Sequence, residues 1–233
     1  MITIHKSHER GHSQLGWLNS YHTFSFGNYY DPKFMGFGHL RVINEDTVKP
    51  GYGFGKHPHH NMEIISYVIS GTLEHKDSMG NGSLIKAGEI QKMSAGTGVE
   101  HSEYNPSATE NLHFLQIWII PEQQQLTPSY EQKMITQERN KLILIGSQTG
   151  TATAIKIQQD INLFAGYLTT NYSLKHTFIN HRVGWLQLIK GKITLNNQLL
   201  SSGDGAAITN EDTITIACSE DAEFLLFDLT SSS

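Results

Sequence analysis

Short apolar stretches alternate with turn-forming residues along most of the chain. The stretches are rich in Val, Ile, Leu and aromatic side chains, which suit the pleated and partly buried surface of a β-strand. We expect strands at Glu63–Ser70, Asn111–Ile120, Gly184–Lys190, Thr213–Ala217 and Glu223–Leu229. Turns rich in glycine and asparagine separate them, as at Gly80-Asn81-Gly82 and Gly203-Asp204-Gly205. This pattern is typical of an all-β sandwich or barrel.

The chain also repeats itself. The sequence YVISG, which ends at Gly71, resembles QLIKG, which ends at Gly191, and Gly88 and Gly203 are the next matching markers. We therefore predict two similar β-barrel domains, residues 1–125 and 126–233. One segment between them, Ser129–Asn140, follows a proline and has few apolar residues, so we expect a polar helix or linker there.

Composition excludes several classes of partner. The 233 residues include 17 basic and 22 acidic side chains, which gives a net charge of −5. Because phosphate binding needs clustered Lys and Arg, nucleic acids and anionic membranes are not expected partners. No apolar run approaches the roughly 20 residues of a membrane span. The one cysteine, Cys218, excludes an internal disulfide and fits a reducing compartment, so we expect a cytoplasmic protein.

Two pairs of polar residues stand out because each pair has the same two-residue spacing. They are His57 with His59, and His101 with Glu103. Residues i and i+2 of a strand point to the same face. Two such strands facing each other across a barrel would bring three imidazoles and one carboxylate to one point. This set suits a divalent first-row metal and leaves positions open for water or substrate.

Glu63 is an alternative carboxylate. It lies four residues after His59 and has the same strand parity, so it could be the ligand in place of Glu103, or could hold a ligand or a water from behind. The other histidines lack a partner at ligand spacing and are expected to be structural or exposed. These are His5, His8, His12, His22, His39, His75, His113, His176 and His181, whereas His60 points to the opposite face from His59 and is expected behind the ligands or at the surface.

The second half of the chain offers an internal comparison. When Gly71 is matched with Gly191 and Gly88 with Gly203, the four candidate ligands correspond to Thr177, Ile179, Ile216 and Cys218. None of these forms a histidine–carboxylate set. We therefore expect a metal in the first domain and no metal ligands in the second.

Several segments together resemble one known family. They are GWL at Gly16–Leu18, HTFSFGNYYDP at His22–Pro32, LRVIN at Leu40–Asn44, HPH at His57–His59, DSMGN at Asp77–Asn81 and SAGTGVEHSEYN at Ser94–Asn105. The chain is similar in these segments to the pirin family, and in particular to bacterial members described as quercetin 2,3-dioxygenases. The similarity is specific from residue 16 to about 120 and looser beyond 140.

The resemblance implies a fold and an activity. It implies two cupin barrels (double-stranded β-helix, or jelly roll) in tandem, the first binding one metal through His57, His59, His101 and Glu103. The implied metal is Fe(II), with Mn, Co, Ni or Zn as alternatives. The implied reaction is ring cleavage of a flavonol such as quercetin by dioxygen, with release of carbon monoxide. Glu103, or Glu63 behind it, is the expected base, the expected partners are a planar polyphenol and dioxygen, and a monomer is the expected state.

Two other functions compete with this one. Some pirins have a regulatory role, in which a metal centre senses redox state and controls binding to another protein. A third possible function is that of a sugar-binding or isomerase cupin. The aromatic side chains near the N-terminus, such as Phe26 and Tyr29, suit an apolar ligand better than a sugar, although most of them are expected to belong to the barrel core.

Overall fold

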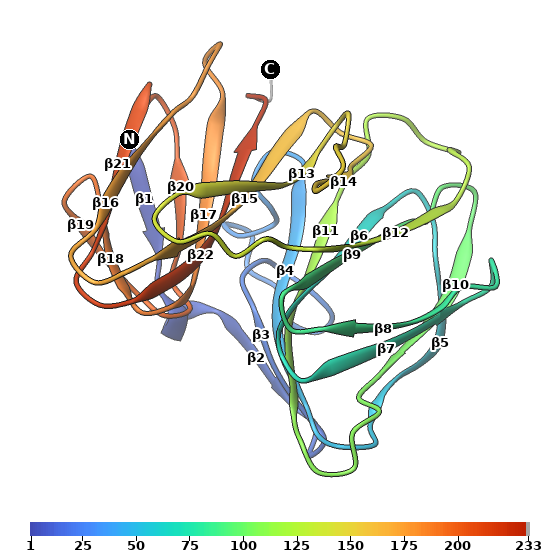
Figure 1. Cartoon of the computed structure of the whole chain (residues 1–233). Helices are drawn as coiled ribbons and strands as arrows, with labels where there is room; N and C mark the ends of the chain where they lie inside the picture. Colours follow the sequence, from blue (N-terminus) through green and yellow to red (C-terminus); the bar gives the residue numbers. More distant parts are fainter. Residues whose placement is uncertain (232–233) are drawn as a thin grey trace. The chain divides into compact units, whose positions relative to one another are not determined.

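The computed structural model describes residues 1–231, and its regular structure is almost entirely β-strand (Figure 1). The one helical element among these residues is a 3-10 turn, η1, at Ser7–Glu9. Within the described chain, no helix is long and apolar enough to cross a bilayer. The predicted all-β class is therefore confirmed.

The N-terminal unit comprises Gly11–Ile135 and Thr149–Gln159. Its larger sheet has the strand order β12-β9-β6-β11-β4-β3-β2, and its smaller sheet has the order β5-β10-β7-β8. Neighbouring strands are antiparallel. The strands are β2 (Gly11–Gln14), β3 (Leu18–His22), β4 (Leu40–Val48), β5 (Gly53–His59), β6 (Glu63–Ser70), β7 (Thr72–Asp77), β8 (Gly82–Lys86), β9 (Glu89–Ser94), β10 (Val99–Tyr104), β11 (Leu112–Ile119), β12 (Ser129–Met134) and β14 (Ile155–Lys156).

The C-terminal unit comprises Met1–Arg10, Thr136–Gln148 and the chain from Asp160 onward. Its strands form one sheet in the order β1-β20-β17-β22-β15-β13 and a second in the order β16-β21-β18-β19. The strands are β1 (Ile2–His5), β13 (Leu142–Ser147), β15 (Ile161–Leu168), β16 (Ser173–Thr177), β17 (Val183–Lys190), β18 (Lys192–Leu195), β19 (Gln198–Ser201), β20 (Gly205–Ile208), β21 (Thr213–Cys218) and β22 (Ala222–Leu229).

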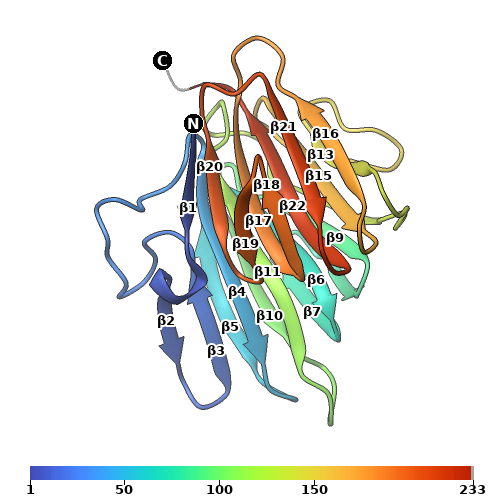
Figure 2. The same cartoon turned by 90° about the vertical axis from the view of Figure 1, so that its left-hand side faces the viewer.

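The units do not follow the predicted division at residue 125. The first strand, β1, pairs with β20 of the C-terminal unit, with Ile2 opposite Ile208 (Figure 2). The expected helix or linker at Ser129–Asn140 begins instead with strand β12, which pairs with β9 and extends the N-terminal unit to Ile135. A strand at the edge of a sheet is held to its neighbour by backbone hydrogen bonds, so a polar segment without an apolar face can form a strand there.

The predicted internal repeat is confirmed by two pairs of glycines. Gly71 and Gly191 have φ of 81° and 90°, and Gly88 and Gly203 have φ of 83° and 84°. At Gly71 and at Gly191, the backbone lies close to the backbone of the residue that precedes a long strand. A Cβ would lie 2.6 Å from the carbonyl oxygen of Asn111 at Gly71, and 2.3 Å from that of Asp221 at Gly191. The same turn is therefore built twice.

Gly71→Ala is expected to lower the free energy of unfolding by about 1–3 kcal/mol, because the left-handed φ and the close carbonyl both oppose a side chain. Urea unfolding of the full chain measures this change. Gly16→Ala is the matched control, since Gly16 has φ of 69° but no atom within 4 Å of its added Cβ. Equal losses in the two variants would show that the close carbonyl contributes nothing.

Candidate metal centre

Strands β5 and β10 bring three histidines together. The strands pair antiparallel with His57 opposite His101 and His59 opposite Val99. The Nε2 atoms of His57 and His101 lie 3.1 Å apart, and one ring nitrogen from each of the three histidines lies within 4.8 Å of the others. At metal–nitrogen distances of about 2.0–2.1 Å, two nitrogens on one ion lie roughly 3 Å apart. The spacing therefore fits a single metal ion.

The histidines are also in the right state to bind a cation. Nδ1 of His57 lies 2.7 Å from the carbonyl oxygen of Gly55. A carbonyl oxygen only accepts, so Nδ1 carries the proton and Nε2 keeps its lone pair. Burial, followed by the charges of His57 and His60, lowers the pKa of His59 to about 4. Burial and the neighbouring histidines likewise lower the pKa of His101 far below its usual range. Both rings are therefore neutral at pH 7, the form in which a histidine can bind a metal.

Glu103 lies at the inner side of this cluster. It follows His101 at the two-residue spacing on β10, where inward residues are buried and outward ones are more exposed. Its Oε1 accepts a hydrogen bond from Ser66 Oγ at 2.9 Å, and its Oε2 accepts one from Gln116 Nε2 at 2.5 Å. Its carboxylate lies within 4.8 Å of ring nitrogens of His101 and His75, in a group that does not include His57 and His59.

The surroundings of Glu103 change its acidity. Burial raises the pKa of the Glu103 carboxyl to about 7, and the charge of Asp46 adds to this effect. The hydrogen bonds from Ser66 and Gln116 oppose it by stabilising the charged form. A carboxyl with a pKa near 7 can both hold and release a proton near neutral pH, which suits a general base.

The structure does not bring Glu63 into the cluster. Its Oε2 accepts hydrogen bonds from Ser94 Oγ at 3.0 Å and from the backbone N–H of Gln158 at 3.1 Å. Burial raises the pKa of Glu63, and the nearby Lys92 ammonium opposes this shift. Neither group of possible ligands among the described residues contains it. Glu63 thus has polar partners that account for its burial.

His75 was not singled out by the sequence analysis, but it lies in the site. It is buried on β7, where Glu103 of β10 is its cross-strand neighbour. Its Nδ1 lies 3.5 Å from Nδ1 of His101, and its Nε2 lies 3.1 Å from Oδ2 of Asp77. His75 and Asp77 have the same two-residue spacing that identified the other pairs, and this signal could have revealed them.

A row of polar side chains crosses the larger sheet opposite this cluster. Adjacent strands place five residues side by side, in the order Gln91, Ser66, Gln116, Asn44 and His22. All five are buried. Hydrogen bonds join neighbours in this row, from Ser66 to Gln116 and between His22 and Asn44. Gln116 in turn donates to Glu103, so the row orients the carboxylate from behind.

A cavity of about 300 Å³ opens beside the three histidines and Glu103. His57, His59 and Glu103 line it together with residues of the polar row. Apolar side chains of Leu15, Leu18, Phe26, Phe54 and Trp118 form much of the remaining wall, which also includes Ser13, Ser20, Asn28 and Asp46. The ring of Trp118 lies edge-on to His59, with centroids 5.0 Å apart. The volume lies at the lower end of the range of about 300–1,000 Å³ for small-molecule sites.

Comparison with known proteins identifies the family. The family model described as Pirin matches residues 3–119, and the model described as Quercetinase C-terminal cupin domain matches residues 144–229. The chain belongs to the pirin family. Both barrels are therefore cupins, as the sequence resemblance implied.

Members of the pirin family match over the full length. A protein of Escherichia coli strain K12 named quercetin 2,3-dioxygenase is 50% identical over 229 residues, which cover 98% of this chain and 99% of that protein. The crystal structure of YhhW from Escherichia coli has a TM-score of 0.97 and 49% identity, and covers 100% of this chain and 99% of that one. The structure of the bacterial pirin YhhW in complex with nickel(II) has a TM-score of 0.96 and 49% identity, with complete coverage of both chains.

The second cupin of this pirin has a different interior. Strand pairing places Ile214 and Ile216 at the positions of His101 and Glu103, and His176 and Phe178 at those of His57 and His59. Thr177 and Ile179, which sequence matching had placed there, are exposed instead. The mismatch arises because four residues separate Phe178 from β17, whereas three separate His59 from β6, so counting back from the matched glycines misplaces the pair by one residue. Ile214, Ile216 and Phe178 belong to an apolar core.

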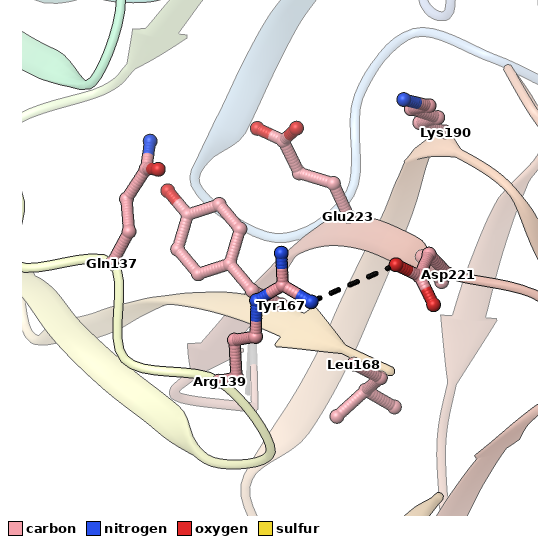
Figure 3. A pocket seen from close by; sticks show the side chains of 8 residues that line it. Gln137, Arg139, Tyr167, Leu168, Lys190, Asp221 and Glu223 are labelled. Atoms are coloured by element: carbon pink, nitrogen blue, oxygen red, sulfur yellow. Dashed lines mark ion pairs between the residues drawn. The ribbon is translucent and has the colours of Figure 1, made fainter. Parts of the chain in front are cut away.

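The C-terminal unit has a hollow of about 160 Å³ of its own (Figure 3). Arg139 and Lys190 line it together with Asp221 and Glu223, so charges of both signs are present. The guanidinium of Arg139 lies 3.8 Å from the carboxylate of Asp221, and both side chains are largely exposed. No histidine lines this hollow. Its chemistry is that of a solvated surface rather than of a metal site.

Proposed function

We propose that this pirin is a metal-dependent dioxygenase that opens the ring of a flavonol such as quercetin and releases carbon monoxide. The observation that carries the proposal is a cluster of three imidazoles, with a buried carboxylate of raised pKa beside His101, at the wall of a cavity that also has apolar side chains. The name of the 50% identical relative from Escherichia coli supports it.

His57, His59, His101 and Glu103 would hold one divalent metal ion, with Fe(II) as the working metal and Mn, Co, Ni or Zn as possible substitutes. When bound, such an ion lowers the pKa of a hydroxyl that it contacts and so favours ionisation of the flavonol. A reducing compartment keeps Fe(II) available, and the single cysteine of the chain is compatible with the cytoplasm.

The residues of the cavity supply the remaining steps. Leu18, Phe26 and Trp118 provide an apolar wall against which a planar polyphenol can lie. Glu103 accepts the proton of the flavonol hydroxyl at a carboxylate oxygen, because its raised pKa makes it a stronger base than an exposed glutamate. Ser66 and Gln116 keep the carboxylate in place during this transfer.

The test is anaerobic reconstitution with each metal in turn, followed by oxygen uptake with quercetin and with simpler catechols. We expect oxygen consumption with carbon monoxide release for at least one metal. Absence of turnover with every metal and every phenol would exclude the enzyme and leave the regulatory role of pirins as the better explanation.

Metal binding is also expected to release a proton from Glu103. Because the pKa of Glu103 is about 7, the carboxyl is mostly protonated at pH 6 and must lose its proton to become a ligand. Protonation of Glu103 should weaken Ni(II) binding by about fivefold between pH 7 and pH 6, and have little effect above pH 8. Calorimetric titration in two buffers of different ionisation enthalpy counts the protons. A wild-type release at pH 6 no larger than that of Glu103→Gln would show that Glu103 is not a ligand.

A further inference from the structure

The DSMGN segment, Asp77–Asn81, contacts the metal centre through one carboxylate oxygen. Oδ1 of Asp77 accepts hydrogen bonds from the backbone N–H groups of Met79 at 2.9 Å and Asn81 at 3.0 Å, and from Nδ2 of Asn81 at 3.1 Å. Its Oδ2 accepts from Asn81 Nδ2 at 2.8 Å and faces Nε2 of His75 at 3.1 Å. The turn thus fixes which oxygen faces His75.

The hydrogen bond to Asp77 determines where His75 carries its proton. An ionised carboxylate only accepts, so Nε2 of His75 must be the donor and Nδ1 keeps its lone pair. Both side chains are 0% exposed, so water does not compete for this contact. Nδ1 of His75 therefore acts as an acceptor toward its neighbour.

That neighbour is His101. The two Nδ1 atoms lie 3.5 Å apart, a long hydrogen bond. Since Nδ1 of His75 can only accept, Nδ1 of His101 is the donor, and its lone pair is on Nε2. Nε2 is the atom that lies 3.1 Å from Nε2 of His57. The register of β10 and β7, with His101 opposite Asp77 and Glu103 opposite His75, holds this arrangement.

We propose that Asp77 and His75 are positioning residues that hold His101 with its Nε2 lone pair directed at the metal. The inference rests on the metal site proposed above. It extends that site by two residues that do not touch the metal, through the general rule that a hydrogen bond to the second ring nitrogen fixes the tautomer of a ligand histidine.

The hydrogen bonds that link Asp77 through His75 to His101 form a relay, and Asp77→Asn tests its direction. Two backbone N–H groups hold Oδ1, so the amide oxygen should stay there and the NH₂ group should take the place of Oδ2, with the Asn81 amide turning its oxygen toward this NH₂. Nε2 of His75 must then accept, and its Nδ1–H points at Nδ1 of His101. This favours the His101 tautomer that has its proton on Nε2, where the metal must bind. We expect Ni(II) affinity to fall by about 10- to 100-fold, as is usual for lost outer partners.

A double-mutant cycle separates this relay from a merely structural role. His75→Leu removes the relay but keeps a shape that the second cupin tolerates, because Leu195 stands at the equivalent strand position. Asp77→Asn should then have no further effect in the His75→Leu background. Glu45→Gln is the matched control, since Glu45 pairs with His113 at 3.0 Å away from the metal, and it should bind Ni(II) as the wild type does.

The measurements are Ni(II) affinity and stoichiometry by calorimetry, and the Nδ1–H signal of His101 by ¹⁵N NMR of the Zn(II) form. We expect this signal to be protected from exchange in the wild type and exposed in His75→Leu. Wild-type affinity in Asp77→Asn, or an equal loss in both backgrounds, would overturn the relay while leaving the metal site intact. Two Ni(II) per chain, one of them lost in His75→Leu, would make His75 a ligand and also overturn it. A wild type that binds no metal would remove the proposed site and the relay together.

Discussion

Replacing His101 by alanine is expected to abolish Ni(II) binding and oxygen uptake with quercetin. His101 supplies one of three nitrogens that lie within 4.8 Å of one another, and it is 1% exposed between its two neighbouring strands. Its loss leaves the β5 pair, His57 and His59, and the carboxylate of Glu103 to hold the ion. We expect affinity to fall by more than the roughly 100-fold that loss of an outer partner can cause.

The fold should survive this change. Removing one buried ring costs about 1–3 kcal/mol, a usual figure for a single buried substitution, and thermal unfolding of the metal-free protein measures it. His113→Ala is the matched control on β11, where His113 is paired with Glu45 and is 30% exposed; metal and activity should remain. If His101→Ala still binds one Ni(II) with wild-type affinity, the proposed ligand set is wrong.

Replacing Glu103 by glutamine is expected to lower turnover by about 10²–10⁴-fold, the usual contribution of a general base, with a smaller loss of metal. The side chain can fit without an unpaired polar group. Its oxygen can face Nε2 of Gln116 where Oε2 now lies, and its NH₂ can donate to Ser66 Oγ. Ser66 in turn can donate to Oε1 of Gln116, which is 3.3 Å away.

Glu103→Gln should also stabilise the metal-free protein at high pH. Because burial raises the pKa of Glu103 from 4.5 to about 7, the wild type loses stability from this group as the pH rises through that range. The variant avoids this loss, so it should gain about 1–3 kcal/mol over the wild type at pH 8 and nothing at pH 4. Urea unfolding at the two pH values measures the difference.

Glu63→Gln is the control for the loss of turnover. Glu63 is as deeply buried as Glu103, but its carboxylate binds Ser94 and Gln158 instead of facing the histidines. The change should leave oxygen uptake near the wild-type level. Normal turnover in Glu103→Gln, together with a loss in Glu63→Gln, would reverse the assignment of the base.

The sequence predicted the proximity of candidate ligands where the signal lies within one strand. The pairs His57–His59 and His101–Glu103 each show the two-residue spacing of a strand face, so they could be read without knowledge of the fold. The row that contains Ser66, Gln116 and Asn44 could not be read in this way, because each strand contributes one residue and only the register brings them together.

The fold was predicted less well at the joins between elements. The strand at Ser129–Met134 has no apolar face and is joined to β9 through backbone pairing. Hydrophobic periodicity therefore gave no sign of it. The match of Thr177 and Ile179 to His57 and His59 was wrong because the connection before β17 is one residue longer than the one before β6. Such a difference in length becomes visible only when the strands are paired, so it leaves no local mark in the sequence.

The pairing of β1 with β20 has a consequence for how the protein is made. Ile2 lies opposite Ile208, so β1 must wait for a partner strand that is translated some 200 residues later. At about 5–20 residues per second, the delay is roughly 10–40 s. The strands of the N-terminal unit leave the ribosome within that interval, so the metal-binding barrel can close before the other barrel gains its edge strand.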